Sequence, residues 1–196
     1  NESRDTTHYS IVDSEGNAVS NTYTLGYSFG SGVTIPGTGI LMNNQMNNFA
    51  YRYGDSSIDG RAASPANRFE AGKRPMSTMT PTMVFNQAGE LMLVTGSPGG
   101  SFIPAAVLRV VSGVIDFDLN IGEATMLPRI HKDWPYSGLD HESILSSDIA
   151  RQLGIMGHKP ESQKTMGSTQ SIHIKKGINY GYADLRRPGA AVSTQR

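Results

Sequence analysis

The chain has 196 residues, of which 17 are Lys or Arg and 17 are Asp or Glu, so its formal net charge at pH 7 is zero. This length suits one domain with a substantial core, and the balanced charge gives no indication of nucleic acid or an anionic membrane as a partner. The absence of cysteine excludes disulfides and thiolate zinc sites. No apolar run reaches the roughly 18 residues that a membrane-spanning helix needs.

The N-terminal part of the chain is predicted to form a β-hairpin followed by loops. Residues 7–12 and 18–25 alternate and are rich in β-branched and aromatic side chains, with turn-forming residues between them, which predicts two paired strands. Thr6 would then lie at the start of the first strand. Residues 26–39 are glycine-rich and are predicted as a loop, and the polar residues 51–71 as a mobile surface segment.

The rest of the chain combines strands with two helices. Apolar residues recur at helical spacing over residues 102–114, with Pro104 in the first turn, where proline is tolerated. A second helix is predicted over residues 144–153, before Gly154. Four segments have the composition and turn signals of strands paired in hairpins: residues 82–85, 91–95, 170–174 and 180–183. Strands packed on strands with helices outside predict an α+β sandwich.

Residues 6–10, Thr-Thr-His-Tyr-Ser, contain a candidate nucleophile in Thr6. A threonine hydroxyl needs a base within hydrogen-bond reach before it can attack a substrate. If Thr6 is the first residue after a cut in the chain, its own α-amine can be that base, because an α-amino pKa of about 7.7 to 8.0 leaves a useful neutral fraction near pH 7. An amide nitrogen lacks this basicity, so residues 1–5 must be removed before Thr6 can turn over substrate.

Residues 96–100, Gly-Ser-Pro-Gly-Gly, lie between a predicted strand and a predicted helix. Backbone N–H groups in such a loop converge on one point and are assisted by the helix dipole, which suits them to hold a developing oxyanion. The pattern alone leaves two other interpretations open. One is a phosphate-binding loop, although the Lys-Ser/Thr pair that should follow its glycines is missing, and the other is an ordinary glycine-rich turn.

The run from Thr6 to Asp13, with residues 17–20 and 22–24 behind it, resembles the start of the small subunit of the γ-glutamyltranspeptidases. The resemblance continues in the family's order through four further segments: residues 43–46, 73–77, 95–101 and 166–171. It implies an N-terminal-nucleophile amidohydrolase with a four-layer αββα sandwich, whose precursor cuts itself immediately before Thr6. Residues 1–5 would then be a residual precursor segment or an overhang, and residues 6–196 a single catalytic domain.

The resemblance also assigns roles to individual residues. Thr6 would be the nucleophile, and Thr24 a second threonine hydrogen-bonded to it. Gly99 and Gly100 would hold the oxyanion of the tetrahedral intermediate, each donor contributing roughly 2.7 to 4 kcal/mol in the transition state. Three residues would bind the amino-acid part of a small-molecule amide substrate, the last two at its α-carboxylate: Gln45, Ser77 and Thr78.

Two positions depart from the family's pattern. Asn48 stands where transpeptidases place an aspartate that pairs with the substrate α-ammonium, and Gly26 where they commonly place another polar ligand of that group. A charge-assisted hydrogen bond contributes about 1.5 to 3 kcal/mol against about 1 for a neutral one, so preference for a free α-amino group is expected to fall. Both substitutions favour the cephalosporin (glutaryl) acylase branch. The alternative is an ordinary γ-glutamyltranspeptidase or glutathione hydrolase with a drifted pocket.

The family implies a large subunit, cut from the same precursor, that completes the acyl pocket; it implies no metal or organic cofactor and leads us to expect a periplasmic or extracellular protein. The opposing hypothesis is an uncleaved, non-catalytic homologue. Trp134 is expected either to line a site or to pack, and the charged turn at residues 184–189 is expected to be structural and solvated. Five histidines without metal-ligand spacing are expected to be structural or superficial: His8, His131, His141, His158 and His173.

Overall fold

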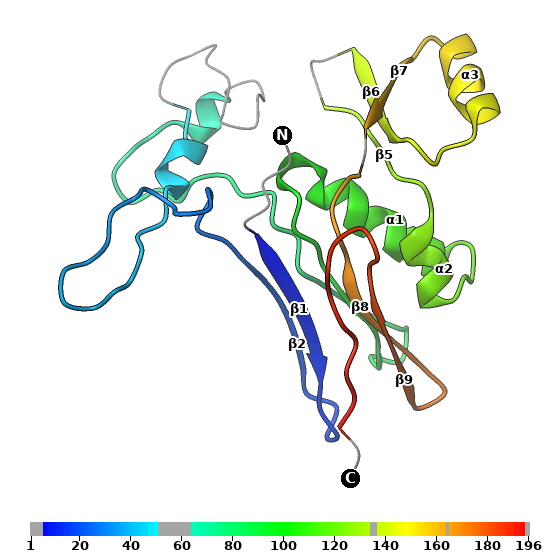
Figure 1. Ribbon diagram of the computed structural model, residues 1–196. Coiled ribbons are helices and arrows are strands. Elements are labelled where there is room, and N and C mark those ends of the chain that lie inside the picture. The colour runs from blue at the N-terminus through cyan, green and yellow to red at the C-terminus, as the bar shows by residue number, and fades with distance from the viewer. Residues whose placement is uncertain (1–5, 51–63, 134–136, 164, 195–196) are drawn as a thin grey trace.

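The computed structural model describes residues 6–50, 64–133, 137–163 and 165–194, which form three β-sheets, three α-helices and three short 3-10 helices (Figure 1). Residues 1–5, most of the predicted surface segment at 51–71, and Trp134 lie outside the described residues. The predicted α+β class is confirmed. The elements that carry the candidate site come from the first two sheets and from the helices that pack on the second.

The predicted N-terminal hairpin is present. β1 (Thr7–Val12) pairs antiparallel with β2 (Ala18–Tyr23), in a register that sets Thr7 opposite Tyr23. The turn is held by the Asp13 carboxylate, whose Oδ1 accepts the N–H groups of Glu15 at 2.8 Å and of Asn17 at 2.9 Å. Because the register is fixed at the turn, the residues just outside the strands, at positions 6 and 24, are brought side by side at the other end.

The second sheet is four-stranded and antiparallel, in the order β3-β4-β8-β9. It consists of β3 (Thr82–Phe85), β4 (Leu91–Thr95), β8 (Gln170–Lys175) and β9 (Ile178–Ala183). The predicted strands are therefore confirmed, with the last two slightly longer than expected. β4 pairs with β8, so residues far apart in the sequence meet in the centre of this sheet.

Helices α1 (Ile103–Ile115) and α2 (Ile121–Met126) cover one face of this sheet (Figure 1). Pro104 lies in the first turn of α1, where its missing N–H costs no hydrogen bond. The buried core between helices and sheet is aliphatic: Leu93, Val110, Val114, Ile121 and Ala124. Helix α2 was not predicted, although Asn120 and Glu123, which form a reciprocal capping box, have the spacing of that motif in the sequence.

The β1-β2 hairpin covers the opposite face of the sheet, through hydrogen bonds from serine side chains. Ser10 Oγ donates to the Gln170 carbonyl at 2.8 Å, and Ser20 Oγ donates to the Thr95 carbonyl at 2.9 Å. Hairpin, sheet and helices are three of the four layers expected for the αββα sandwich. Among the described residues no helix covers the outer face of the hairpin, where Tyr9, Ile11, Val19 and Tyr23 are exposed.

His8 reinforces this contact by a directional chain of hydrogen bonds. Its Nδ1 lies 2.8 Å from Thr22 Oγ1 and its Nε2 lies 3.1 Å from Ser10 Oγ. Since the Ser10 hydroxyl proton goes to Gln170, Ser10 accepts from Nε2–H and the Thr22 hydroxyl donates to Nδ1. The ring is buried against Gly96, where a Cβ would meet it within 2.2 Å, and burial lowers the pKa of His8 to about 4. His8 is therefore neutral and structural, as expected.

A third sheet was not predicted. β5 (Ile130–His131), β6 (Gly138–Glu142) and β7 (Lys159–Gln163) lie in that order, and β6 and β7 run parallel with α3 (Ser147–Ile155) as their crossover. The strand sequences are polar and β7 contains a proline, so they lack the alternation that marks a strand. The predicted helix at 144–153 is present but begins three residues later.

The charged turn at residues 184–189 is structural, but two of its charged side chains are buried, so the expectation that these charges are solvated was wrong. Asp184 and Arg186 are buried in an ionic network with Arg129 and Glu142. Arg129 Nη2 lies 2.6 Å from Asp184 Oδ2, and Arg186 Nε lies 2.6 Å from Glu142 Oε1. Burial raises the pKa of Asp184, but Arg129, Arg186 and backbone N–H groups outweigh it and hold that pKa below its usual value.

We predict that His8 makes stability depend on pH. The histidine pKa is 6.5 in the unfolded chain and about 4 in the folded one, so between these values the unfolded state binds more protons. The free energy of unfolding should fall as pH drops through this window, by at most about 3 kcal/mol from this residue. Urea unfolding should show that the stability advantage of the wild type over His8→Gln shrinks towards low pH. An advantage of constant size would contradict the prediction.

We also predict that Asp184→Asn destabilises the fold strongly, because it leaves the buried Arg129 without its charge partner. Breaking a buried ion pair from one side costs about 3 to 5 kcal/mol. The matched control is Asp118→Asn, which breaks the exposed 2.9 Å pair between Asp118 and Lys175 and should change stability little. Equal shifts of the denaturant midpoint in the two variants would contradict the assignment of the network as a buried stabilising element.

Candidate active site

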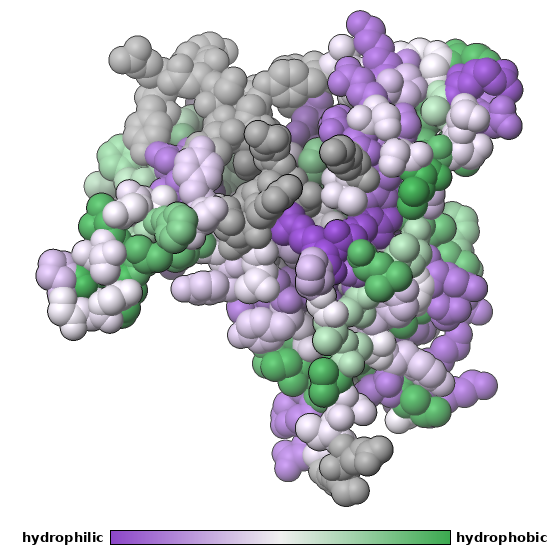
Figure 2. All heavy atoms as spheres, viewed as in Figure 1, coloured by the Kyte–Doolittle hydropathy of each residue, from purple (hydrophilic) through white to green (hydrophobic). Residues whose placement is uncertain are grey.

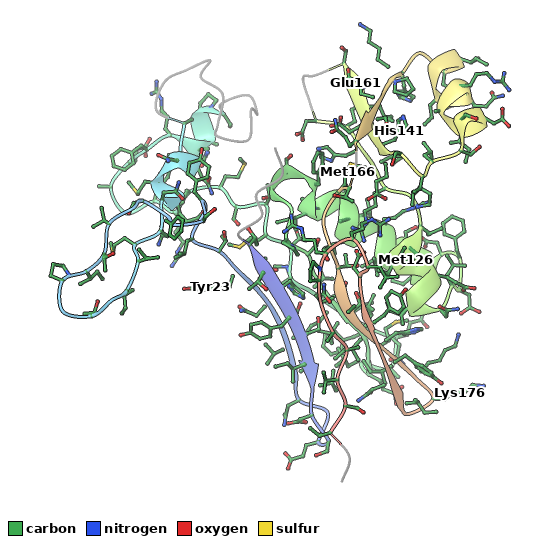
Figure 3. The ribbon with its side chains drawn as sticks, viewed as in Figure 1. Tyr23, Met126, His141, Glu161, Met166 and Lys176 are labelled. Atoms are coloured by element: carbon green, nitrogen blue, oxygen red, sulfur yellow. The ribbon has the colours of Figure 1, made fainter. Side chains whose placement is uncertain are left out.

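Thr6 and Thr24 are hydrogen-bonded at the open end of the hairpin. Thr6 Oγ1 donates to Thr24 Oγ1 at 3.0 Å, and the Gly26 N–H donates to the same oxygen at 2.9 Å. Thr6 is 9% exposed and Thr24 is half-buried. The side chain of Tyr23, labelled in Figure 3, marks the end of β2 next to this pair. The arrangement holds the Thr6 hydroxyl in one orientation, as a nucleophile requires.

Gly99 and Gly100 lie between the end of β4 and the start of α1. Their φ angles are +135° and +57°, in the region that favours glycine, and Gly99 is buried. In the described part of the chain, neither of their N–H groups has an acceptor. The loop and the start of β1 lie at the same end of the sandwich, where His8 contacts Gly96 (Figure 1). Two amides without an acceptor, at the same end of the sandwich as the Thr6 hydroxyl, fit an oxyanion hole.

The predicted substrate residues Gln45 and Asn48 lie in one 3-10 turn, Gln45–Asn48. Asn48 Nδ2 donates to Gln45 Oε1 at 2.7 Å, which fixes the orientation of both amides. The Asn48 carbonyl in turn accepts from Asn67 Nδ2 at 2.6 Å. Phe49 and Phe69 pack edge to face beneath this turn, with ring centroids 5.4 Å apart. Asn67 was missed in the sequence, because an isolated asparagine in a loop carries no signal of a distant partner.

Gly26 has a conformational reason to be glycine. Its φ is +94°, and a Cβ would lie 1.9 Å from Asn44 Oδ1. That same Asn44 oxygen accepts the Tyr27 N–H at 3.1 Å, so it is held where a side chain at position 26 would go. Gly26 is therefore accounted for by local packing, and its presence is not by itself a sign of a changed substrate.

Ser77 and Thr78 are tied to the same cluster through the residue before them. The Met76 N–H donates to Asn67 Oδ1 at 2.9 Å, and Asn67 binds the Asn48 carbonyl. Ser77 is exposed and its Oγ accepts the Met79 N–H at 3.1 Å, while Thr78 is half-buried. The turn that carries Gln45 and Asn48 also lies beside Gly26, because a Cβ added at position 26 would come 3.5 Å from Gln45 Nε2.

The described residues offer no metal centre: no three of their His, Asp or Glu side chains are grouped as metal ligands. Nor is any helix among them long and apolar enough to cross a membrane. The surface next to the site is apolar instead. Figure 2 shows hydrophobic residues along the loop that follows the hairpin, on the left of the view. The exposed apolar side chains of this loop include Tyr27, Phe29, Val33, Ile40 and Met42.

Comparison with known proteins agrees with this geometry. The family model described as Gamma-glutamyltranspeptidase matches residues 1–194. The glutathione hydrolase proenzyme of Escherichia coli (strain K12) is 45% identical over 186 residues, which cover 94% of this chain and 32% of that protein. The chain thus spans about a third of the length of this relative.

Solved structures share the fold. The γ-glutamyltranspeptidase from Pseudomonas nitroreducens superposes with a TM-score of 0.88 at 37% identity, covering 96% of this chain and 100% of that one. The cephalosporin acylase from Bacillus halodurans superposes with a TM-score of 0.81 at 28% identity, covering 96% of this chain and 34% of that one. The family model, the sequence relatives and the solved structures coincide over nearly the whole chain, which therefore belongs to the γ-glutamyltranspeptidase family.

Proposed function

We propose that this chain is the catalytic part of an N-terminal-threonine amidohydrolase and acyltransferase that cleaves γ-glutamyl amides. The observation that carries the proposal is the hydrogen bond between the buried Thr6 and the half-buried Thr24, at the same end of the sandwich as a loop whose two glycine amides have no acceptor among the described residues. A positioned hydroxyl and a pair of convergent N–H donors are the two parts that acyl transfer needs. No metal or organic cofactor is required by this chemistry.

The proposed reaction proceeds through an acyl-threonine intermediate. Once the Asp5–Thr6 bond is cut, the α-amine of Thr6 takes the hydroxyl proton, directly or through a water, while Oγ1 attacks the amide carbonyl. The Gly99 and Gly100 N–H groups stabilise the oxyanion, and the leaving amine departs with a proton. Water or a second amine then attacks the ester and releases the acyl group. Thr24 accepts from the Thr6 hydroxyl in the resting site and holds it in place.

The substrate is proposed to carry a free α-amino group, contrary to the expectation of a glutaryl acylase. Relatives at 41 to 45% identity are glutathione hydrolase proenzymes, whereas the cephalosporin acylase is 28% identical. Gly26 was one of the two substitutions that favoured an acylase, but its positive φ and the close approach of Asn44 explain why this residue is glycine. Asn48 donates to Gln45, which leaves its Oδ1 as a neutral acceptor for the substrate ammonium. Because Asn48 replaces the aspartate of transpeptidases with a neutral amide, a glutaryl acylase is the second candidate function.

The remainder of the precursor is proposed to be the large subunit of an αβ heterodimer. The E. coli relative is about three times as long as this chain, which covers 32% of it. The outer face of the hairpin and the loop after it expose apolar side chains, and contiguous apolar surface of this kind marks an interface. A large subunit on this face would supply the missing layer of the sandwich and the rest of the acyl pocket.

The proposal is tested first by the two adjacent threonines. Thr6→Ala in the full-length precursor should abolish both self-cleavage and hydrolysis, because it removes the attacking oxygen. Thr7→Ala should leave self-cleavage intact, since the Thr7 side chain is exposed on the outer face of β1. Intact mass reports the cut and a chromogenic γ-glutamyl anilide the turnover. A precursor that stays whole in an assembled wild-type sample would indicate a non-catalytic homologue, and acylation of Thr7 would refute the nucleophile assignment.

Substrate preference is tested by Asn48→Asp with γ-glutamyl and glutaryl derivatives of one chromogenic amine, which differ only in the α-ammonium. The ratio of their kcat/KM values isolates that contact. The wild type should prefer the γ-glutamyl compound. Asn48→Asp should raise this preference by about 1 to 3 kcal/mol, because it adds a charge beside the ammonium. The matched control, Asn47→Asp, adds a charge at an exposed neighbour and should leave the ratio unchanged. A wild type that prefers the glutaryl compound would favour the acylase.

A further inference from the structure

The directions of the Gly99 and Gly100 N–H groups are set by the carbonyls at the other end of their peptide units. A trans peptide is planar, so its N–H points opposite to its C=O, and fixing one fixes the other. The Gly100 N–H shares its peptide unit with the Gly99 carbonyl, which accepts the Phe102 N–H at 3.1 Å. The Gly99 N–H shares its unit with the Pro98 carbonyl. The first unit is held by backbone, in the turn that begins the helix.

The second unit is held by a side chain, that of Ser97. Ser97 Oγ donates to the Pro98 carbonyl at 2.6 Å and accepts the Ser168 N–H at 2.8 Å. Ser97 is fully buried and Ser168 nearly so, so water does not compete for either bond. Gly99 has a φ of +135° and no side chain, so it restricts rotation of this peptide less than another residue would. The hydroxyl of Ser97 is the contact that aims the Gly99 N–H.

Ser168 is held in turn by the buried ionic network. On one side, the Met166 N–H donates to Glu142 Oε1 at 3.0 Å. On the other, the Thr169 N–H donates to Asp184 Oδ2 at 2.9 Å. The segment between them is therefore held at both ends, and Figure 3 shows Met166 beside α1. The backbone that carries the Ser168 N–H is therefore held in place where it donates to Ser97 Oγ.

Gly167 allows the 166–169 segment to approach the Ser97 hydroxyl closely. Its φ is +70°, and a Cβ there would lie 2.7 Å from Ser97 Oγ and 3.0 Å from the Ala106 side chain. Any side chain at position 167 would displace the Ser97 hydroxyl or the start of α1. The close approach of this backbone is thus matched to the hydroxyl that it holds.

We propose that Ser97 is a positioning residue of the oxyanion hole: it orients the Gly99 N–H through the Pro98 carbonyl, on support that the 166–169 segment transmits from the ionic network. The inference rests on the proposed amidohydrolase function. Ser97 does not touch the substrate. Its loss should raise the barrier of steps that pass through an oxyanion and leave the binding of the ground state unchanged.

The test uses the complete complex, with this chain expressed from Thr6 and the rest of its precursor as a second chain, so that turnover does not depend on self-cleavage. In hydrolysis of a γ-glutamyl anilide, Ser97→Ala should lower kcat roughly tenfold to hundredfold, below the cost of deleting a donor outright, and change KM by less than about threefold. Gly167→Ala should act in the same direction. Affinity for a tetrahedral boronate analogue should fall with kcat, while affinity for the product glutamate stays constant.

The matched control is Ser171→Ala. Ser171 is a buried serine of β8 whose hydroxyl bonds Thr95 Oγ1 at 2.7 Å, so its removal costs a comparable buried hydrogen bond that does not involve the Pro98 carbonyl. An active wild type in which Ser97→Ala and Ser171→Ala have equal kcat values, or in which Ser97→Ala weakens glutamate and boronate alike, overturns this inference alone. A wild-type complex that does not hydrolyse γ-glutamyl amides overturns the proposed function and the inference with it.

Discussion

Four buried charges hold together parts of the chain that belong to different layers. Arg186 donates to the carbonyls of Thr125 at 2.8 Å and of Leu127 at 3.0 Å, at the C-terminal end of α2, where helix carbonyls lack partners within the helix. Through Glu142 the same side chain reaches β6 in the third sheet. Removing charges from water is costly, and the cost is offset here because each carboxylate accepts several hydrogen bonds. The end of α2, the third sheet and the segment that follows the strand ending at Ala183 are joined by this one cluster.

Local sequence signals predicted the elements that depend on local interactions. The N-terminal hairpin follows from alternation and a turn that Asp13 closes on itself, and α1 follows from helical spacing of apolar residues behind Pro104. The third sheet depends on tertiary contacts instead. β6 is stabilised by pairing with β7 and by the ion pair of Glu142 with Arg186, and neither is visible in a stretch of polar residues.

The candidate site shows the same division. Its residues were predicted from motif resemblance, and the structure brings Thr6 to Thr24 and Gln45 to Asn48 at hydrogen-bonding distance. The residues that hold these pairs in place were not predicted, because their partners are remote in sequence. Gly26 shows the opposite error: a departure from a family pattern was interpreted as chemistry, whereas the backbone angle and Asn44 explain it sterically. Differences between relatives carry functional meaning only after such local causes are removed.

The polar contact between hairpin and sheet also fixes the position of Thr6 along the strand direction. Strand side chains alternate between faces, so a slip of one residue along the sheet would turn His8 outward, and a slip of two would move Thr6 by about 7 Å. An apolar interface tolerates such slips more easily, because one apolar side chain can occupy the place of another without losing a directional bond. The hydrogen bonds that run from Thr22 through His8 and Ser10 to the Gln170 carbonyl match donors with acceptors in only one register of the hairpin on the sheet. The position of the Thr6 hydroxyl is thus set by hydrogen bonds in the middle of the sandwich, several residues away from Thr6 itself.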